Sequence, residues 1–505
     1  MELSALLFPG EYTSTYSTRG IEISTVCYRG SQITPGCLFI CLRGTRYDGH
    51  ALLRTAQAVG AAAALVEEGA KSPLPPGLPV FTVPNTRRMM AHIYYRLSHC
   101  PANGMHLIAV TGTNGKTSTA TMLYSILRAC QKNAALIGTV ACRCGDKFYP
   151  REREENTASM TTPDPDVLYP MLEQMKADGV EYVIMEASSH ALALEKLAPL
   201  HFDVGIFTNL SPEHLDFHGT MENYLAAKAR LFLQCDRAIL NCDDEYAERL
   251  AKSIPCKVLR CGAVYHEQYN AEEIRARSAD GVSYIYATPR LKMPVHVPLP
   301  GAFTVYNSLL ALTCALQIGL PPLQAKDALQ KMQGVPGRLE RVLLPPEAGF
   351  TVLIDYAHTE AALRNLLQTV RSFRHGGERI VLVFGCGGDR DKSKRAPMGR
   401  AAEELADYTI LTSDNSRSEE PVTIIHDILK GMRFPARRRV IVDRRRAIVH
   451  AIHSAAANDI ILLVGKGHEE YELSDGARHP FDEKSIVLEA YQTRTTEKEQ
   501  HENTP

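Results

Sequence analysis

The chain has 505 residues, 45% of them hydrophobic, so it can bury several cores, and at roughly 100–200 residues per domain we expect about three domains. Its formal net charge of -1 supplies no concentrated basic field of the kind that binds nucleic acid or a membrane surface. We therefore expect neither class of protein, and we interpret the arginine runs 437–439 and 444–446 as a solvated face.

The cysteines and the N-terminus indicate a cytoplasmic protein. The 13 cysteines are scattered and odd in number, which is typical of reduced thiols. The N-terminus lacks the basic and apolar regions of a signal peptide, and no apolar run reaches the roughly 20 residues that a membrane helix needs. We expect no membrane insertion, and we expect a monomer.

A small α/β domain is predicted for residues 1–103. Short apolar strands at 38–42 and 62–66 accompany an alanine-rich helix at 51–59. A helix at 85–99 precedes a turn-forming stretch, and we place the first domain boundary there.

The second predicted domain, 104–335, begins with a phosphate-binding loop. An apolar strand at 106–110 breaks into TGTNGKTS, and a helix is predicted at 119–129. Glycines in this loop allow close backbone approach, and the free N–H groups at the helix start attract an anion. Lys116 supplies a charge for the outer phosphates and Thr117 a hydroxyl for Mg²⁺. The loop is a shorter variant of the general P-loop, because Val110 stands where that motif has its first glycine.

Further strands of this domain end in polar residues. Strands at 182–185, 204–207 and 238–240 are followed by Glu186, by Thr208-Asn209 and by Asn241. Continuous apolar runs that alternate with helices indicate a buried parallel sheet, whose ligands gather beyond the carboxyl ends of its strands. The polar residues should therefore share one crevice with Lys116.

A metal site is predicted in that crevice. Glu186, in EASSH, and His214, in SPEHLDFHG, together with Thr117 supply ligands for Mg²⁺ against ATP phosphates. Lys228 lies on a helix shortly after His214, and an ammonium there would repel the metal. Carbamylation by CO₂ would turn Lys228 into a carboxylate ligand.

Residues 336–493 repeat the open α/β pattern. Strands are predicted at 352–354, 380–384, 409–411 and 460–464, and each runs into polar or glycine residues. The remaining residues, 494–505, are charged and poor in apolar side chains, so we expect disorder there.

The polar rim of the third domain suits an amino acid. Arg390 and Arg417 can grip carboxylates with two parallel hydrogen bonds, and Asp414 and Glu469 complement an ammonium. The rim can therefore hold a zwitterionic amino acid that carries a further polar end, although glycine-rich charged loops are also ordinary turns.

Together, GTNGKTS, TTPD at 161–164, EASSH, HLDFHG, DYAH at 355–358, GCGGDRD and GKGHE resemble the motifs of the Mur ligases, in that family's order. The likeness covers nearly the whole chain. It implies a central P-loop-type parallel sheet with helices on both faces, a Rossmann-like open sheet after it and a smaller α/β domain before it. It also implies an ATP-dependent, Mg²⁺-using ligase that adds the third amino acid to UDP-N-acetylmuramoyl-L-alanyl-D-glutamate.

The resemblance assigns a role to each matching residue. For ATP these are Gly112, Thr113, Asn114, Gly115, Lys116, Thr117, Ser118, Asn307, Arg338 and Asp355. For the UDP-muramoyl dipeptide they are Val26, Tyr28, Thr161, Thr162, Ser188 and Lys196. For the incoming amino acid they are Arg390, Asp414, Asn415, Ser416, Arg417, Gly465 and Glu469. The catalytic group would be Lys116, Glu186, His214 and Lys228, with Thr117, Glu186, His214 and the carbamate of Lys228 (N6-carboxylysine) on the metal.

Some positions depart from the family pattern. Cys27-Tyr28-Arg29 stands where the family often has Asp-Ser-Arg, and Lys196 where arginine is common. The diaminopimelate motif Asp-Asn-Pro-Arg is here Asp-Asn-Ser-Arg, with Ser416 in place of proline. A loop without proline is less restricted in φ. Arg417 favours meso-diaminopimelate, but a loop that swings Arg417 outwards would favour L-lysine or ornithine.

Two other functions share parts of these motifs. Folylpolyglutamate synthase has the phosphate loop and the ligase chemistry but no uridine role for a first domain. A non-catalytic nucleotide-dependent binding module would keep the ATP loop alone. The retention of Glu186, His214, Lys228 and the amino-acid rim favours the muramyl ligase.

Overall fold

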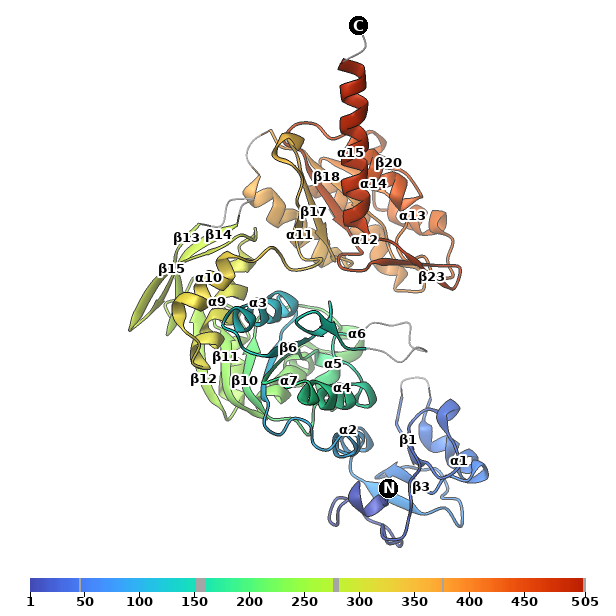
Figure 1. Cartoon of the computed structure of the whole chain (residues 1–505). Coiled ribbons are helices and arrows are strands. Elements are labelled where there is room, and N and C mark those ends of the chain that lie inside the picture. The colour runs from blue at the N-terminus through green and yellow to red at the C-terminus, as the bar shows by residue number, and fades with distance from the viewer. Residues whose placement is uncertain (45–46, 151–159, 276–280, 375–376, 503–505) are drawn as a thin grey trace. The chain divides into compact units, whose positions relative to one another are not determined.

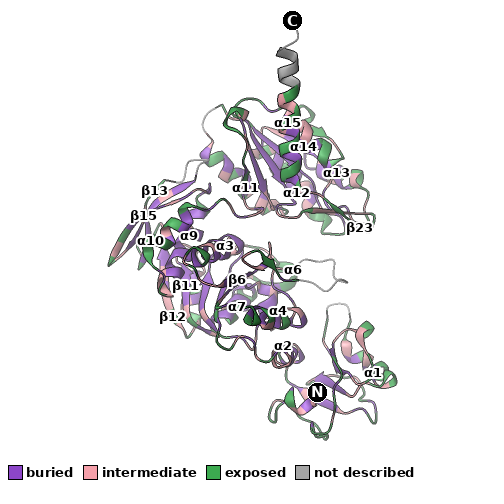
Figure 2. Cartoon of the chain, viewed as in Figure 1, coloured by how far each residue is buried: buried purple, intermediate pink, exposed green. Residues whose placement is uncertain are grey.

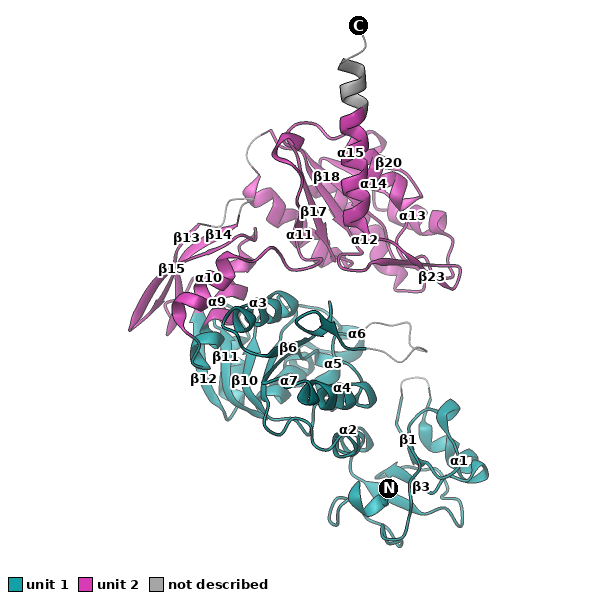
Figure 3. Ribbon diagram, viewed as in Figure 1, with its two compact units in different colours: residues 1–261, 313–320 teal, residues 262–312, 321–505 magenta. Residues whose placement is uncertain are grey.

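The computed structural model describes residues 1–44, 47–150, 160–275, 281–374 and 377–502, the last six by their backbone alone (Figure 1). It divides into two compact units (Figure 3). The first comprises residues 1–261 with 313–320, and the second residues 262–312 with 321–505. The domain boundaries at 103 and 335 stay predictions.

The first unit begins with a small parallel sheet in the order β1-β2-β3-β4. Its strands are β1 (Val26–Cys27), β2 (Leu38–Ile40), β3 (Ala63–Glu67) and β4 (Val80–Val83), with helices α1 (Leu53–Val59) and α2 (Thr86–Leu97). Alternate residues of β2 enter different cores, because Leu38 and Ile40 pack in one and Phe39 in the other. This double burial explains why β2 and β3 are continuously apolar.

The central sheet of the first unit runs in the order β12-β11-β10-β5-β9-β6-β7-β8. It is parallel from β12 to β6, and β7 and β8 are added antiparallel. The strands are β5 (His106–Thr111), β6 (Ala134–Ile137), β7 (Cys142–Cys144), β8 (Lys147–Phe148), β9 (Tyr182–Glu186), β10 (Phe202–Phe207), β11 (Cys235–Asn241) and β12 (Lys257–Gly262). The helices are α3 (Lys116–Ala129), α4 (Pro165–Ala177), α5 (Ser189–Ala193), α6 (Leu215–His218), α7 (Met221–Phe232) and α8 (Ala247–Ser253).

The strand order positions the site. Strand β5 lies between β10 and β9, with Thr111 opposite Phe207 and Val110 opposite Glu186. The three carboxyl ends therefore lie side by side. Helix α3 starts at Lys116 rather than at the predicted residue 119, because Gly115 is its N-cap and Lys116 to Ser118 form its first turn.

The second unit begins with three antiparallel strands that the sequence did not predict, β13 (Tyr269–Arg275), β14 (Val282–Thr288) and β15 (Leu291–Val297). Helices α9 (Phe303–Gln317) and α10 (Pro322–Gln330) follow along the chain. The larger sheet has the order β16-β17-β21-β18-β19-β20, in which only the pairing of β16 with β17 is antiparallel among the described strands. Its strands are β16 (Glu340–Val342), β17 (Thr351–Asp355), β18 (Ile380–Phe384), β19 (Tyr408–Leu411), β20 (Arg438–Val440) and β21 (Ile460–Val464).

Helices cover both faces of this sheet. Ile380, Leu382 and Phe384 of β18 pack in the core that includes α11 (Glu360–Phe373), α12 (Arg395–Leu405) and α13 (Pro421–Leu429). Val381 and Val383 enter the opposite core, with α14 (Arg444–His453) and α15 (Glu483–Glu502). The central strands β18 and β21 are accordingly buried along their length (Figure 2). The hairpin of β22 (Tyr471–Ser474) and β23 (Ala477–Pro480) stands apart as its own small sheet.

Two expectations about charged segments differ from the structure. Arg444 is 1% exposed, so the run 444–446 is not wholly solvated; its Nε donates to Glu483 Oε1 at 2.7 Å. Helix α15 extends to Glu502, through the stretch from 494 for which we expected disorder, because Glu, Lys and Gln are good helix formers even without an apolar face. Residues 503–505 lie outside the described residues. Among the helices described, none combines the length and the apolar character needed to cross a bilayer.

Candidate functional site

The phosphate loop joins β5 to α3 and is held by the residues after β10. Gly112 has a φ of 149°, and a Cβ there would overlap the hydroxyl of Thr208, so only glycine fits. The Thr113 N–H donates to Asn209 O at 2.8 Å, and Thr208 Oγ1 donates to Asn114 O at 2.6 Å. These hydrogen bonds hold the loop in an anion-binding shape.

Lys116 lies over this loop. Its Nζ donates to the carbonyls of Gly112 and Thr113 at 2.9 and 2.8 Å. Thr117 and Ser118, next in α3, are 6% and 8% exposed. The predicted ATP residues of the first unit are thus contiguous and centred on one helix start.

Glu186 is buried beside the loop, at the end of β9. It is 1% exposed, and its Oε2 accepts from Thr117 Oγ1 at 2.9 Å. Thr139 also serves this carboxylate, through its N–H at 2.8 Å to Oε1 and its hydroxyl at 3.1 Å to Oε2. The same hydroxyl lies 3.1 Å from Thr161 Oγ1, from which it can accept a hydrogen bond. We did not predict Thr139, because a lone threonine after an unrecognised strand, β6, gives no sequence signal.

These residues fit Mg²⁺ only as a partner of a nucleotide. Across the described ranges, no group of three or more His, Cys, Asp or Glu side chains is arranged to hold a metal ion. Mg²⁺ commonly keeps several waters and binds one or two carboxylates together with substrate phosphates. The adjacent oxygens of Thr117 and Glu186 meet that need.

Lys228 is an uncommon lysine, because it is 1% exposed on α7. Burial lowers its pKa well below the ordinary lysine value, Lys116 lowers it further, and Glu213 opposes both. A neutral amine is a nucleophile, which an exposed ammonium is not.

His214 lies near both lysines. It is the N-cap of α6 with a φ of 55°, in the left-handed region, which aims its ring at Tyr224 with the centroids 6.4 Å apart. Burial lowers the pKa of His214, and Lys116 and Lys228 add to this effect while Glu213 opposes it. Three of the predicted catalytic residues, Lys116, His214 and Lys228, therefore interact electrostatically.

Tyr224 links these groups. We did not predict this role, because an aromatic residue on an amphipathic helix is usually only part of the core. It is 1% exposed, and its OH lies 3.2 Å from Thr113 Oγ1 in the phosphate loop. Lys228 Nζ lies 4.5 Å from the centroid of the Tyr224 ring. The same ring stacks on His218, with the two ring centroids 4.9 Å apart. His218 in turn shares a hydrogen bond of 3.0 Å with Ser189 Oγ.

The residues predicted for the dipeptide lie next to Glu186. Thr162 Oγ1 donates to the Glu186 carbonyl at 2.8 Å and accepts from the Ser188 N–H at 3.1 Å. Lys196 is 7% exposed and pairs with Asp164 at 2.7 Å. With Thr161, these side chains form one polar cluster beside β9.

Val26 and Tyr28, the two residues near the first sheet that were predicted to contact the UDP-muramoyl dipeptide, have different surroundings. Val26 is part of the hydrophobic core, and its carbonyl accepts from Tyr94 OH at 3.1 Å. Burial raises the pKa of the Tyr28 phenol, and Asp166 and Asp164 raise it further. Tyr28 is thus near the start of α4, whereas Val26 has little to offer a ligand beyond its backbone.

The remaining nucleotide residues belong to the second unit. Asn307 is 4% exposed on α9. Burial raises the pKa of Asp355, although Arg338 and the N–H groups of Leu339 and Ala357 oppose this. Within the described residues the buried Arg338 Nε has no hydrogen-bond partner. A role for these residues towards ATP stays a prediction.

The predicted amino-acid rim is a connected polar network. Asn415 Nδ2 donates to Glu469 Oε2 at 2.7 Å, and Lys466 Nζ donates to Asn415 Oδ1 at 3.0 Å. Burial alone would raise the pKa of Asp414, but Lys466 and Arg444 hold it below its usual range. Lys466 is 0% exposed, and we did not predict it, although it lies inside GKGHE.

Arg417 is fixed rather than turned to solvent. Its Nη1 donates to Gly388 O at 2.8 Å and to Asn415 O at 3.3 Å, with a backbone φ of 53°. Its N–H donates to Leu473 O of β22 at 3.0 Å. The hairpin therefore restrains the backbone of this loop, as a proline at position 416 would in the Asp-Asn-Pro-Arg motif. Arg390 is exposed, and Gly465 follows β21 with its N–H on Asp355 O at 3.1 Å.

Three family models match the chain. The Mur ligase middle domain matches residues 110–315, the glutamate ligase domain of Mur ligases matches 337–467, and the catalytic domain of the Mur ligase family matches 22–95. The first two matches fall on the sheets that carry the phosphate loop and the amino-acid rim, and the third falls on the sheet of β1 to β4. The fold and these matches define an amino-acid ligase of the Mur type.

Individual proteins are similar to this chain over most of its length. The UDP-N-acetylmuramoyl-L-alanyl-D-glutamate--2,6-diaminopimelate ligase of Clostridioides difficile is 39% identical over 476 residues, 93% of this chain and 95% of that protein. A solved structure of an enzyme of the same name is 31% identical with a TM-score of 0.65, covering 94% of this chain and 95% of that one. The folylpolyglutamate synthase of Mycobacterium tuberculosis shares the fold at 18% identity and a TM-score of 0.60, covering 74% of this chain and 92% of its own. The chain belongs to the Mur ligase family.

Proposed function

We propose that the chain is an ATP-dependent ligase that joins meso-diaminopimelate to UDP-N-acetylmuramoyl-L-alanyl-D-glutamate, a step of peptidoglycan precursor synthesis. One observation carries the proposal: the phosphate loop, Glu186 and Lys228 meet at one edge of the central sheet. The 39% identity to a ligase of that name supports the choice of substrates.

The reaction takes two steps. The terminal carboxylate of the dipeptide attacks the γ-phosphorus of ATP, ADP leaves, and an acyl phosphate forms. The amine of the incoming amino acid then attacks the acyl carbon, phosphate leaves, and the nitrogen gives up a proton. The chain has little covalent chemistry to perform, so its contribution is positioning and charge stabilisation.

Named residues would supply that stabilisation. Lys116 places its ammonium over the loop, where it would neutralise charge on the outer phosphates. Thr117 and Glu186 would hold Mg²⁺, which when bound screens the phosphate charge. Thr161, Thr162, Ser188 and Lys196 would orient the dipeptide beside them.

Lys228 would act as a carbamate. Its neutral amine attacks the carbon of CO₂, an N–C bond forms, and one proton leaves for solvent, so a buried cation becomes an anion. Its lowered pKa supports this change by supplying the neutral amine. The carbamate would lie close to Lys116, whose positive charge favours an anion.

The fixed position of Arg417 supports meso-diaminopimelate over lysine or ornithine. A guanidinium can hold the distal carboxylate with two hydrogen bonds, but it would repel a distal ammonium. Asp414 and Glu469 would meet an ammonium group, and Arg390 a carboxylate.

The test is phosphate release with ATP and UDP-muramoyl dipeptide, in the presence of meso-diaminopimelate, L-lysine or ornithine. Release that requires both the dipeptide and diaminopimelate is the expected result. Release that needs no dipeptide would reject the muramyl ligase, and equal rates with lysine would reject the specificity. A cytoplasmic location and a monomeric state stay expectations from the sequence.

A further inference from the structure

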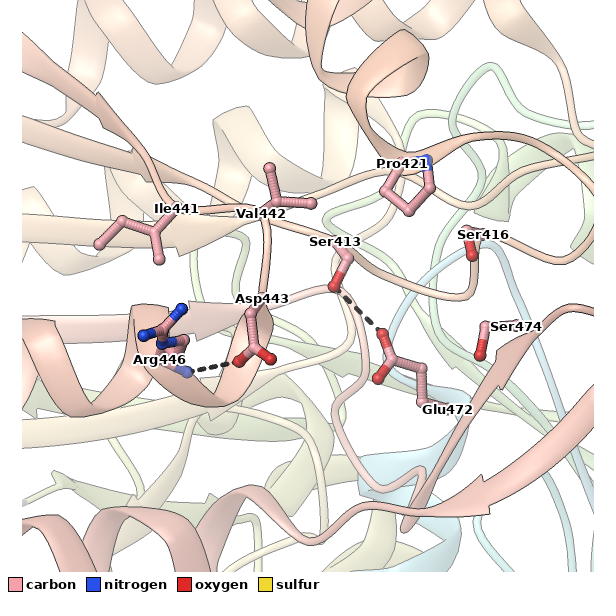
Figure 4. Close-up of a pocket in the computed structure, with 9 residues that line it drawn as sticks. All are labelled: Ser413, Ser416, Pro421, Ile441, Val442, Asp443, Arg446, Glu472 and Ser474. Carbon is pink, nitrogen blue, oxygen red and sulfur yellow. Dashed lines mark hydrogen bonds between the residues drawn. The ribbon is translucent and has the colours of Figure 1, made fainter.

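A cavity of about 440 Å³ lies in the second unit, between the loop after β19 and the hairpin strand β22 (Figure 4). Ser413 and Ser416 line it from the loop, and Glu472 and Ser474 line it from β22. The volume lies within the range of about 300–1,000 Å³ of small-molecule sites.

The cavity is separate from the partners of the predicted amino-acid rim. Lys466 and Arg444 lower the pKa of Asp414, and the side chain of Asn415 donates a hydrogen bond to Glu469. Neither Asp414 nor Asn415 lines the cavity, and of the residues predicted for the incoming amino acid only Ser416 does so in this part of the described chain. The cavity is therefore on another side of the same loop.

Two side chains of the cavity, Glu472 and Arg446, keep polar atoms without a hydrogen bond to a described residue. Glu472 Oε1 accepts from Ser413 Oγ at 3.1 Å, whereas its Oε2 makes no hydrogen bond to any described residue. Arg444 pairs with Glu483 and Arg445 with Glu489, but the guanidinium of Arg446 makes no ion pair within the described ranges. Glu472 and Arg446 thus line the same cavity, each with a polar group that no described residue hydrogen-bonds. The charge of Glu472 also interacts with Arg444 and Lys466.

The charges select a class of ligand. Asp443 and Glu472 supply two carboxylates, and Arg446 one guanidinium, beside the apolar side chains of Ile441 and Val442. Two carboxylates disfavour a simple anion, and the guanidinium disfavours a simple cation. A small molecule that carries both an ammonium and a carboxylate can pair with the carboxylates and with the guanidinium at the same time.

We propose that this cavity binds a small zwitterionic α-amino acid, at a site apart from that of the amino-acid substrate. Its ammonium meets Glu472 and Asp443, and its carboxylate meets Arg446. The serine hydroxyls at 413, 416 and 474 provide further hydrogen bonds.

The site is built to affect Arg417. The Arg417 N–H donates to Leu473 O, and the Asp475 N–H donates to Arg417 O, each at 3.0 Å, so β22 holds this residue in its left-handed conformation. A ligand between Ser416 and Ser474 contacts both sides of that connection. The expected consequence, which rests on the proposed function, is a changed KM for the substrate amino acid.

Binding is tested first, without ATP or the muramoyl substrate, by calorimetric titration of the full chain. The probes are meso-diaminopimelate, L-lysine and glycine as zwitterions, with n-butylamine and acetate as the two halves. The variants are Arg446→Ala, the matched control Arg445→Ala on the same helix, and Arg390→Ala in the substrate rim. Val442→Trp fills the cavity as a second test.

We expect at least one zwitterion to bind the wild type, Arg445→Ala and Arg390→Ala equally, and at least tenfold more weakly to Arg446→Ala and Val442→Trp. Each half probe should bind more weakly than that zwitterion. Equal binding to Arg446→Ala and Arg445→Ala, or loss of the same binding in Arg390→Ala, would overturn the proposal. Because no turnover is measured, failure of the proposed ligase function would leave this result unchanged.

Discussion

Lys228 Nζ lies 4.5 Å from the centroid of the Tyr224 ring, one helical turn earlier on α7, and both residues are 1% exposed. The hydroxyl of the same tyrosine lies 3.2 Å from Thr113 Oγ1 in the phosphate loop. Tyr224 therefore touches both the loop and the lysine, and we assign it as a positioning residue.

Replacing Tyr224 by phenylalanine should separate these two contacts. Tyr224→Phe keeps the ring under Lys228 but loses a buried hydrogen bond of about 1 kcal/mol, so KM for ATP should rise about fivefold with carbamylation unchanged. Tyr224→Leu should raise KM for ATP and also lower carbamylation of Lys228. Steady-state kinetics and mass spectrometry measure the two effects. Tyr284→Phe in the other unit, which also loses a buried hydroxyl, is the control. A purely structural role is indicated if both tyrosine variants change Tm but not KM.

Lys228→Ala should be nearly inactive, because no carbamate can form there. Short carboxylates such as formate or acetate should restore part of the activity by occupying the vacated space. In the wild type, ¹³C NMR under ¹³CO₂ should show one carbamate that the variant lacks. Lys252→Ala, an exposed lysine on α8, should behave as wild type. Full activity of Lys228→Ala would contradict the carbamate.

Lys116→Ala should keep the fold, because the loop whose carbonyls Lys116 Nζ bonds is also held by Thr208 and Asn209. It should lose about 1.5–3 kcal/mol of phosphate binding and more in the transition state, so kcat/KM for ATP should fall about 10²–10³-fold. Lys176→Ala, exposed on α4, is the matched control for activity and Tm. Near-normal turnover in Lys116→Ala would remove the assignment of the loop.

Arg417→Ala should reduce kcat/KM for meso-diaminopimelate far more than for L-lysine. Loss of a charged, two-bond clamp costs about 2–3 kcal/mol, a factor of about 30–150. Arg400→Ala, an exposed arginine on α12, serves as the control. If the loss of Arg417 affects both amino acids equally, the distal-carboxylate clamp is wrong.

Amino-acid binding should depend on pH through Glu469. Burial raises the pKa of Glu469, and Asp414 raises it further, so below that pKa the carboxyl is neutral and attracts an ammonium poorly. KM for the amino acid should therefore fall as pH rises through the raised pKa. Glu469→Gln should flatten this profile, and Glu470→Gln, its exposed neighbour, should keep it. An unchanged profile in Glu469→Gln would assign the titration to another group.

Local patterns predicted the strands and the loops that follow them. The predicted strands at 380–384 and 460–464 coincide with β18 and β21, because runs buried on both faces must be apolar throughout. Strand order then explains why Glu186 meets Thr117, since parallel neighbours end at the same edge. The family resemblance is confirmed by the matching family models and relatives.

The sequence by itself determined the phosphate loop, the parallel sheets and the family, because each rests on a local motif or on periodic burial. Tertiary structure alone decided that Tyr224 carries Lys228, that Lys466 is buried in the rim, that Arg444 is paired inside the second unit and that β22 fixes Arg417. These features join residues distant in the chain or depend on depth below the surface. A side chain's charge state and restraint follow from its neighbours in space, which the order of residues does not list.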